Sequence, residues 1–365
     1  MGTKHGEGAH PDGRGEDANE AGGTDGTEQR DTKKKPWRKR TMEYLAVLFF
    51  MSSTFSALLG WMLAIALLLA SRATAAIMAV YLAWMFLGPG QPIRSKTWST
   101  PLRNAGLWKH FVDYFPIKLV KTAELDPKKN YVFAYHPHGV ICLGGWGNFM
   151  TNATGFDDRF YGIKLHALTL KMNLNTPFLR TYLHWHGASD VSKETCRAIL
   201  ERGPGNAIFL AVGGALESLH AYPGEYSIVL KHRKGFVRVA LQTGSCLVPV
   251  LSFGEPDTFL TRTPRPGTLG RQKLYDFYRR FGVVFPEVTG DFWHLFGFMP
   301  QRTPIVSVVG SPLEVPKTDG KKGDPDFEAV VDHYHALYIE RLRDLWDRHK
   351  NTLALHRIGT MKVVE

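Results

Sequence analysis

The sequence predicts an α/β protein in which a mixed sheet is flanked by helices and preceded by an N-terminal pair of membrane helices. Short apolar runs that read as buried strands occur at 131–135, 207–212, 247–251 and 305–309. Segments with helical periodicity lie between or after these runs, at 192–202, 232–243 and 326–350. A chain of 365 residues, 44% hydrophobic and 22% charged, is long enough to bury a sizeable core.

Residues 1–40 are expected to form a disordered tail that ends in a basic cluster. Residues 1–32 hold 3 Lys or Arg against 8 Asp or Glu, and no Val, Ile, Leu, Phe, Trp, Tyr or Cys. Such a segment lacks the apolar surface needed to offset chain entropy. Six of the eight residues in 33–40 are basic, and the chain carries a net charge of +11.

Residues 41–93 are expected to form a transmembrane hairpin. The 28 residues from Tyr44 to Ser71 are uncharged and as one helix would extend about 42 Å, against a hydrocarbon core of roughly 30 Å. After Arg72 a second uncharged stretch runs to the helix-breaking Gly88-Pro89-Gly90. A tight turn near Ser71–Thr74 would join the two spans.

The basic cluster before the first span places the tail in the cytosol by the positive-inside rule, and two spans return residues 94–365 to that side. Two alternatives remain open. In the first alternative, the two stretches are buried core helices of a soluble protein. In the second, they form one long tilted span followed by an interfacial helix. The second alternative would place the large domain in the lumen.

Charge and cysteine content exclude several classes. The basic body suits nucleic acid, an anionic membrane or a phosphate-bearing substrate, but no zinc-finger spacing or aromatic RNP signature favours nucleic acid. Cys142, Cys196 and Cys246 are too few and too widely spaced for a disulfide framework or a thiolate zinc site. We therefore expect reduced thiols and no nucleic-acid partner.

The run at 131–135 leads directly into His136-Pro137-His138-Gly139. Ligands collect at the carboxyl ends of strands in α/β folds, and Pro137 and Gly139 favour a sharp exit that exposes the imidazoles. A neutral histidine there can accept a proton from a hydroxyl group. The alternative is a satisfied structural histidine.

Metal binding is a rival interpretation of the histidines, because three His-x-His pairs occur in the chain. Side chains at alternate positions of a strand share a face, but the sequence has neither His-x-x-x-His nor His-Glu-x-x-His. We therefore expect no metal. The pairs are His136/His138, His184/His186 and His333/His335.

A second strand, 207–212, runs into Gly213-Gly214 and then Glu217. Glycines let the backbone approach a ligand closely, and the Glu217 carboxylate could orient an imidazole or bind a hydroxyl group. The structural alternative is that Glu217 caps a helix.

A third stretch, Arg233-Lys234-Gly235-Phe236-Val237-Arg238, combines positive charge with an apolar helical stripe. Such a cluster can hold the phosphates of a nucleotide or of coenzyme A. A solvated basic face, or one lying on anionic lipid, is the alternative. The chain has no Gly-x-Ser-x-Gly elbow, phosphate-binding loop or dinucleotide fingerprint.

Taken together, these stretches resemble the type-2 diacylglycerol acyltransferase family, which includes monoacylglycerol and wax-alcohol acyltransferases, within the lysophospholipid acyltransferase superfamily. Four blocks carry the likeness from about residue 100 to 350. They are 113–116, 135–139, 212–219, and 233–240 with Val248-Pro249 and Phe253-Gly254-Glu255.

The resemblance implies a glycerolipid-acyltransferase-like fold and transfer of a fatty acyl group from acyl-CoA to diacylglycerol, without an acyl-enzyme, a metal or a cofactor. It makes His138 the general base, with His136 orienting or assisting. Because no aspartate follows five positions after either histidine, Glu217 is our candidate partner carboxylate. The implied substrate-binding residues are Tyr114, Phe115, Pro116, Pro137, Gly139, Gly213, Gly214, Arg233, Lys234, Gly235, Phe236 and Arg238.

The expected partners are acyl-CoA, diacylglycerol and the bilayer, and assembly as a homo-oligomer stays open. The resemblance places the enzyme in the endoplasmic reticulum membrane as a multi-pass protein with a cytosolic catalytic domain, or on the lipid droplet surface. Two alternatives remain: a monoacylglycerol or fatty-alcohol acceptor, and an inactive lipid-binding or lipid-droplet scaffold.

Overall fold

The computed structural model describes Gly2 and residues 36–54, 56–87, 100–291 and 297–365. The chain divides into two compact units, residues 1–36 and 37–365. Everything below concerns the second unit, and the expected disordered tail lies almost entirely outside the described residues.

A seven-stranded mixed sheet forms the centre of this unit, as predicted. Its order is β1-β10-β7-β2-β5-β3-β4. All neighbours are parallel except β10 and β7. The four predicted apolar runs coincide with β2, β5, β7 and β10. The strands are β1 Lys118–Lys121, β2 Tyr131–His136, β3 Lys164–Thr169, β4 Ser189–Asp190, β5 Asn206–Ala211, β7 Cys246–Phe253 and β10 Val306–Val309.

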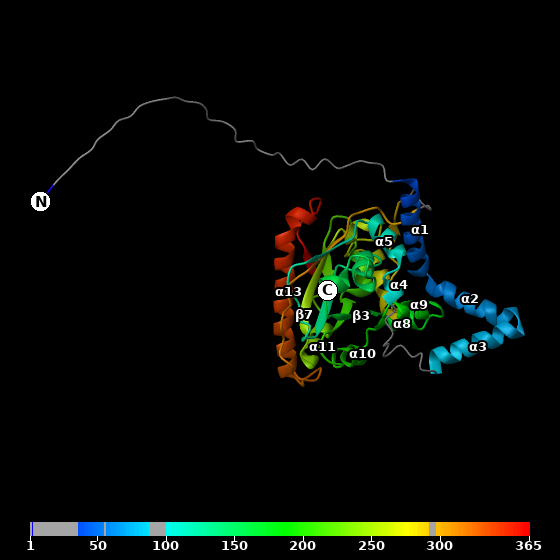
Figure 1. Cartoon of the computed structure of the whole chain (residues 1–365), viewed down its shortest axis with the longest axis horizontal. Helices are drawn as coiled ribbons and strands as arrows, with labels where there is room; N and C mark the ends of the chain where they lie inside the picture. The colour runs from blue at the N-terminus through cyan, green and yellow to red at the C-terminus, as the bar shows by residue number, and fades with distance from the viewer. Residues whose placement is uncertain (1, 3–35, 55, 88–99, 292–296) are drawn as a thin grey trace, which may run out of the picture. The chain divides into compact units, whose positions relative to one another are not determined.

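Helices cover both faces of the sheet (Figure 1). Side chains alternate along β2, so Phe133 and Tyr135 join an aromatic core on one face, while Val132 and Ala134 join an aliphatic core on the other. On the aromatic side lies α5, Gly106–Tyr114; on the other side lie α10, Lys193–Leu200, α11, Gly235–Thr243, and α13, Pro325–Leu353. The three predicted helical segments correspond to α10, α11 and α13.

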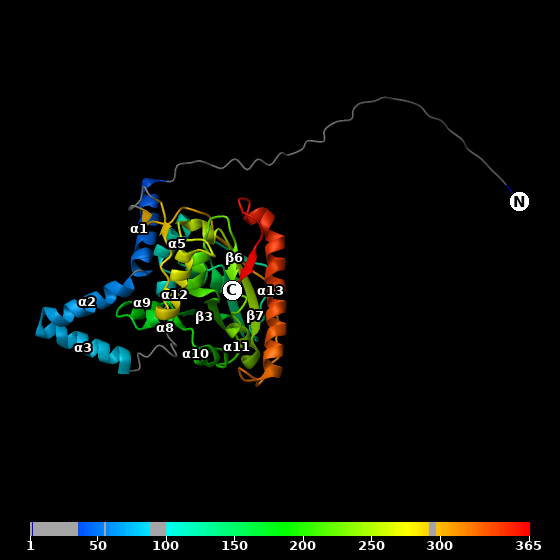
Figure 2. The same ribbon diagram turned by 180° about the vertical axis from the view of Figure 1, so that it is seen from behind.

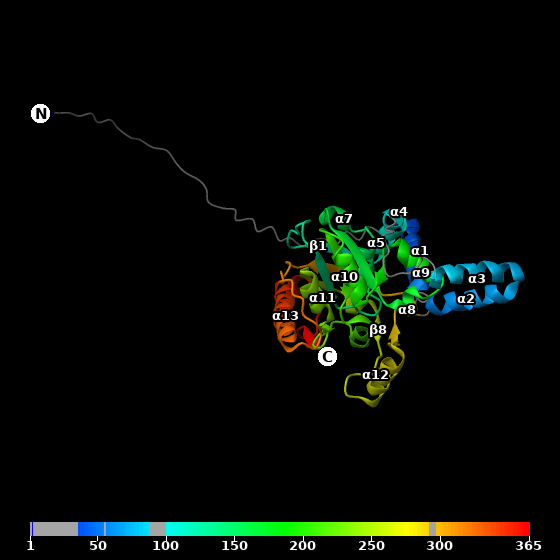
Figure 3. The same ribbon diagram turned by 90° about the horizontal axis from the view of Figure 1, so that it is seen from below.

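Short elements complete this unit. Two small sheets pair β6, Ser227–Val229, with β11, Lys362–Val364, and β8, Leu260–Thr261, with β9, Val288–Thr289. Other helices of this unit are mostly short. They are α4 Thr100–Arg103, α6 Leu143–Gly145, the π-helix Trp146–Met150, α7 Phe156–Arg159, α8 Lys171–Leu174, α9 Leu179–Trp185, the 3₁₀ helices Gly214–His220 and Glu255–Thr258, and α12 Leu269–Phe281. Figure 3 shows α12 projecting from the body beside β8.

The expected first membrane span, Tyr44–Ser71, is split between two helices. The first, α1, runs Trp37–Thr54 and the second, α2, runs Ser56–Ala70. α1 packs against α5 and buries Ala46, Val47, Phe50 and Met51 in the aromatic core. Apolar side chains in the first half of the expected span are therefore part of the protein's own core.

α2 and α3, Arg72–Leu87, form a hairpin that extends away from the sheet (Figures 1 and 2). The predicted turn is confirmed: Ser71 and Thr74 each accept, through the side-chain hydroxyl, a hydrogen bond from the other's main-chain N–H, at 3.1 Å. Large apolar side chains on both helices are exposed, among them Leu59, Ile65, Ile77 and Val80. In the described part of the chain, no helix is at once long enough and apolar enough to cross a membrane.

A buried ion pair fastens α1 to the body. The Glu43 carboxylate, fully buried, accepts a hydrogen bond from Arg302 at 2.7 Å. The Arg302 guanidinium also lies 4.1 Å from the ring centroid of Tyr114 and 5.0 Å from that of Tyr44. This cluster links α1, α5 and the segment before β10.

We expect Glu43→Ala to lower the free energy of unfolding by about 2 kcal/mol, less than for a wholly buried pair because Arg302 is partly exposed. The control Glu201→Ala breaks an exposed pair with Arg197 and should cost roughly 0.5 kcal/mol or less. Thermal melts of the purified proteins in detergent measure both. Equal losses would show that the Glu43 pair is no anchor.

Candidate active site

His138 lies in the loop that follows β2, at the carboxyl edge of the parallel part of the sheet. Its Nδ1 is 3.2 Å from the Gly139 carbonyl oxygen. Because a carbonyl only accepts, this contact places the hydrogen on Nδ1 and leaves a lone pair on Nε2. Burial lowers the pKa of His138, against a smaller opposing effect of the Gly139 hydrogen bond. The imidazole is therefore neutral and able to accept a proton.

His138 lines a cavity of about 310 Å³, which we call the His138 cavity. Its walls come from α1, the loop after β2, the π-helix, α8, α9 and the ends of β3 and β5. Most of the side chains that line it are apolar. They include Phe50, Ile141, Trp146, Leu170, Leu183 and Phe209. The His138 imidazole thus faces a space suited to an apolar chain.

Glu217 reaches His138 through the main chain and not through the imidazole. One carboxylate oxygen accepts the His138 main-chain N–H at 2.6 Å, and the other accepts the Val229 N–H at 2.9 Å. Burial raises the pKa of Glu217 to about 8. The expected partner of the imidazole thus contacts the main chain of His138: Glu217 holds the loop, and the ring nitrogen Nδ1 lies against the Gly139 carbonyl instead.

The glycines before Glu217 are explained by its packing. A Cβ on Gly213 would lie 2.1 Å from the Glu217 carboxyl carbon. Gly214 has φ +60°, a conformation that glycine adopts without penalty. Gly213 therefore leaves room for the Glu217 side chain, and Gly214 allows the turn of the main chain before it. Neither glycine lines the His138 cavity.

Glu255 is a second buried carboxylate that sequence reasoning did not assign to the site. It accepts N–H bonds from Leu143 at 2.6 Å and Gly144 at 2.9 Å, and the hydroxyl of Tyr135 donates to it at 2.9 Å. Burial raises its pKa to about 7. A Cβ on Gly139, where φ is +61°, would lie 2.6 Å from the Glu255 Cγ.

One signal could have revealed Glu255. The sequence Phe253-Gly254-Glu255 follows a buried strand with a glycine and then a carboxylate, the same order that singled out Glu217. The two glutamates together fix both ends of the loop from His138 to Gly144.

His136 points away from the His138 cavity and into the aliphatic side of the sheet. Its Nε2 is 3.0 Å from the hydroxyl of Tyr338, which donates its own hydrogen to the Ala134 carbonyl at 3.1 Å. The His136 Nε2 therefore donates, and burial lowers the pKa of this imidazole to about 3. The predicted orienting or assisting role is not supported, because His136 is a structural core residue. Pro137, between the two histidines, is buried and does not line the cavity.

The basic stretch lies on the other face of the sheet, beside a second cavity of about 410 Å³. Side chains alternate between the two faces of the sheet along β5 and at the residue after it. Leu210 and Val212 line the second cavity, while Phe209 and Ala211 line the His138 cavity. We call it the basic cavity, after its cationic residues. These are Lys193, Arg233, Lys234, Arg238 and Lys322, with His232 beside them.

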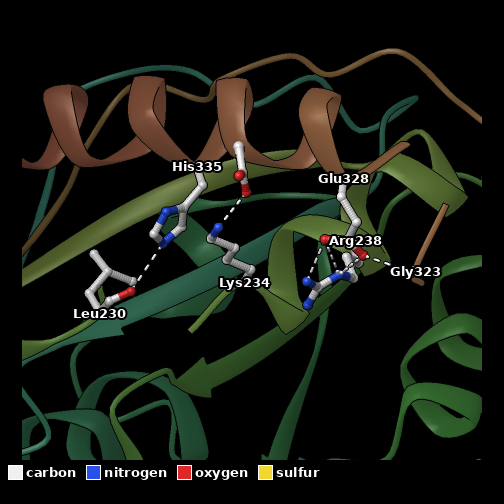
Figure 4. Close-up of polar contacts among 7 residues, drawn as sticks. Leu230, Lys234, Arg238, Gly323, Glu328 and His335 are labelled. Atoms are coloured by element: carbon white, nitrogen blue, oxygen red, sulfur yellow. Dashed lines mark hydrogen bonds and ion pairs between the residues drawn. The ribbon is translucent and has the colours of Figure 1, made fainter. Parts of the chain in front are cut away.

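Two of the predicted phosphate-binding cations are already paired with α13 (Figure 4). Lys234 pairs with Asp332, and Arg238 makes a two-pronged pair with Glu328, with an Nη2 to Oε2 distance of 2.6 Å. Among the described residues no hydrogen bond or ion pair is found for the Arg233 side chain, but its positive charge acts on Glu217 and lowers the pKa of that carboxyl group against the larger effect of burial. Gly235 begins α11, and Phe236 is buried against Tyr338 with ring centroids 4.9 Å apart.

The block at 113–116 lies away from the His138 cavity. Tyr114 and Phe115 are buried in the aromatic core, where the Tyr114 hydroxyl donates to the Pro300 carbonyl at 2.8 Å. Pro116 is exposed on a separate surface hollow. The structure thus places Tyr114 and Phe115 in the core and Pro116 on the surface, apart from the His138 cavity, and their predicted substrate contacts stay a prediction.

Across the described ranges, no three His, Cys, Asp or Glu side chains gather as a metal site would require. His136 and His138 in particular lie on opposite sides of the sheet.

Comparison with known proteins places this site in a family. A family model described as diacylglycerol acyltransferase matches residues 67–363. Diacylglycerol O-acyltransferase 2 of Dictyostelium discoideum is 44% identical over 286 residues, 78% of this chain and 85% of that protein. The proteins of the same name from Xenopus tropicalis and Homo sapiens are 43% and 38% identical, each over 79% of this chain and over 80% and 74% of their own lengths.

Among solved structures, the 1-acyl-sn-glycerophosphate acyltransferase PlsC of Thermotoga maritima matches 84% of this chain and 97% of its own with 10% identity and a TM-score of 0.34. That likeness is too weak to bear on function. The family model and the curated relatives each span most of the chain, as the four sequence blocks predicted. The chain therefore belongs to the diacylglycerol acyltransferase family.

Proposed function

We propose that this chain transfers a fatty acyl group from acyl-CoA to the free hydroxyl of diacylglycerol, making triacylglycerol. The observation that carries the proposal is the neutral imidazole of His138, whose Nε2 lone pair is free at the edge of an apolar cavity. Membership of the family, whose curated relatives are named diacylglycerol O-acyltransferase 2, supports the choice of reaction.

In the proposed reaction, His138 Nε2 removes the proton of the acceptor hydroxyl as its oxygen attacks the thioester carbonyl. The carbon–sulfur bond then breaks, and the imidazolium gives this proton to the leaving thiolate. The products are an ester and free coenzyme A, with no acyl-enzyme. A main-chain N–H in the glycine turn at Gly139, between His138 and Val140 of the cavity wall, is our candidate donor to the oxyanion.

Acyl-CoA would cross the carboxyl edge of the sheet, where ligands of open α/β folds bind. In this arrangement the acyl chain occupies the His138 cavity and the coenzyme A phosphates lie in the basic cavity. Arg233 is the candidate phosphate ligand, because Lys234 and Arg238 already pair with α13.

We further propose that the α2–α3 hairpin associates with the endoplasmic reticulum membrane or a lipid droplet surface, with the catalytic body on the cytosolic side. The exposed apolar side chains of both helices support this, since a surface this apolar is unfavourable in water. Both the acceptor and the product are lipids that must exchange with a bilayer.

Replacing His138 with Ala should lower kcat by about 10²- to 10⁴-fold, because the proton acceptor is lost. His136→Gln is the matched control: it alters a core hydrogen bond and should lower stability more than the rate per folded molecule. Transfer from labelled acyl-CoA, measured in membranes that lack other neutral-lipid synthesis, tests both variants.

Diacylglycerol, monoacylglycerol and fatty alcohol are offered separately in that assay. Product mainly from another acceptor would keep the mechanism and change the substrate. If His138→Ala stays as active as the wild type, His138 is not the base. No product from any acceptor with inserted wild-type protein would favour the scaffold alternative.

Glu217→Gln should lower kcat roughly 10- to 100-fold, because an amide has one acceptor oxygen for the two N–H groups that the carboxylate holds. On the acidic side the rate should rise with pH through a pKa below the usual 6.5 of histidine, since only neutral His138 acts as a base. The variant should leave that acidic limb in place. A shift of the limb by Glu217→Gln would instead indicate that Glu217 contacts the imidazole.

A further inference from the structure

The entrance to the His138 cavity is bordered by exposed apolar side chains. Leu170 lines the cavity and is also 42% exposed, so it stands at the opening. Met172 of α8 and Trp185 of α9, which do not line the cavity, are 47% and 55% exposed. Apolar side chains this exposed are common singly, but these lie on or next to α8 and α9, the two short helices that also supply walls of the cavity.

The α2–α3 hairpin is attached to this same segment. The ring of Tyr81 on α3 stacks on Phe178, with centroids 5.5 Å apart, and its hydroxyl accepts the Phe178 N–H at 2.9 Å. Arg180 donates to the Met85 carbonyl. On α2, a Cβ at Gly60 would lie 2.7 Å from the Pro177 carbonyl oxygen, so the backbones are in close contact.

The apolar surface of the hairpin therefore continues onto α8 and α9. Figures 1 and 3 both show α8 and α9 beside the base of α2 and α3. The exposed charge on α8 is Lys171, whose long side chain suits the headgroup level of a membrane.

The size of the His138 cavity also limits how a lipid can bind. At about 310 Å³ it is at the lower end of the range that encloses a drug-sized ligand. A glycerolipid with two long chains does not fit inside, so most of its acyl tails must stay outside while its hydroxyl reaches His138. An apolar surround at the mouth is what those tails require.

We propose that the rim formed by Leu170, Met172, Phe178 and Trp185 lies against the bilayer together with the hairpin, and that the acceptor lipid enters the His138 cavity from the bilayer across this rim. The entry route rests on the proposed function, because it assumes an uncharged two-chain acceptor. The contact of the rim with lipid does not depend on it.

The contact is tested by fluorescence quenching in vesicles that carry nitroxide-labelled lipids. Met172→Cys, in a Cys142→Ser background, is labelled with an environment-sensitive fluorophore. Leu355→Cys, which replaces a 70% exposed leucine after α13, is the matched control. We expect quenching at residue 172 well above that at residue 355. Equal quenching at both positions would overturn the proposed contact.

The entry route is tested by kinetics with Trp185→Asp and the control Leu355→Asp. A carboxylate at the rim should reduce kcat/KM about tenfold for long-chain diacylglycerol in vesicles. It should leave transfer to a short-chain diacylglycerol dissolved as monomers unchanged, because that acceptor need not cross the rim from a bilayer. Equal losses on both acceptors, or no loss on either, would overturn the route. Failure of the proposed function would give a different result. Wild-type protein would then acylate neither acceptor, while the quenching experiment would still test the contact of the rim with lipid.

Discussion

Two buried carboxylates that bind main-chain N–H groups hold the site together. Glu217 fixes the loop after β2 at His138, and Glu255 fixes it at Leu143 and Gly144. Burial raises the pKa of both carboxyl groups toward neutrality, to about 8 and about 7. Desolvation of this kind is costly unless hydrogen bonds compensate it, and here the loop's own amides provide them. The position of His138 therefore depends on contacts that the imidazole itself does not make.

The side chains that support the fold behind β2 lie apart from the imidazole that faces the cavity. His136 and Tyr338 belong to the aliphatic core, while His138 faces the opposite side of the same sheet and an apolar cavity. The cations of the basic cavity lie on the other face of the sheet, and two of them, Lys234 before α11 and Arg238 within it, pair with α13 (Figure 4). A ligand with a charged end and an apolar end matches two cavities of this kind, and acyl-CoA has that form.

Four strands of the central sheet (β2, β5, β7 and β10), the helices α10, α11 and α13, and the loop that carries His138 could be predicted from the sequence, because apolar runs, helical periodicity and glycine turns have local signatures. The role of Glu217 could not, since its two acceptor contacts are to the main chain of Val229 and of a loop 79 residues away. Glu255 belonged to one of the four blocks but was given no role, since its contacts with Leu143 and Gly144 are equally remote in the sequence. The core contacts within the stretch expected as a span from Tyr44 could not be predicted, because hydropathy does not distinguish apolar side chains buried in protein, such as Phe50, from those that face lipid.

The measurement that tests the central claim most directly is a double-mutant cycle on kcat with Glu217→Gln and Glu255→Gln. If both carboxylates act by holding one loop, loss of either already frees His138, and the double variant should be much less impaired than the product of the two single effects. Strictly multiplicative effects would contradict the account, because they would mean that the two glutamates act independently of one another.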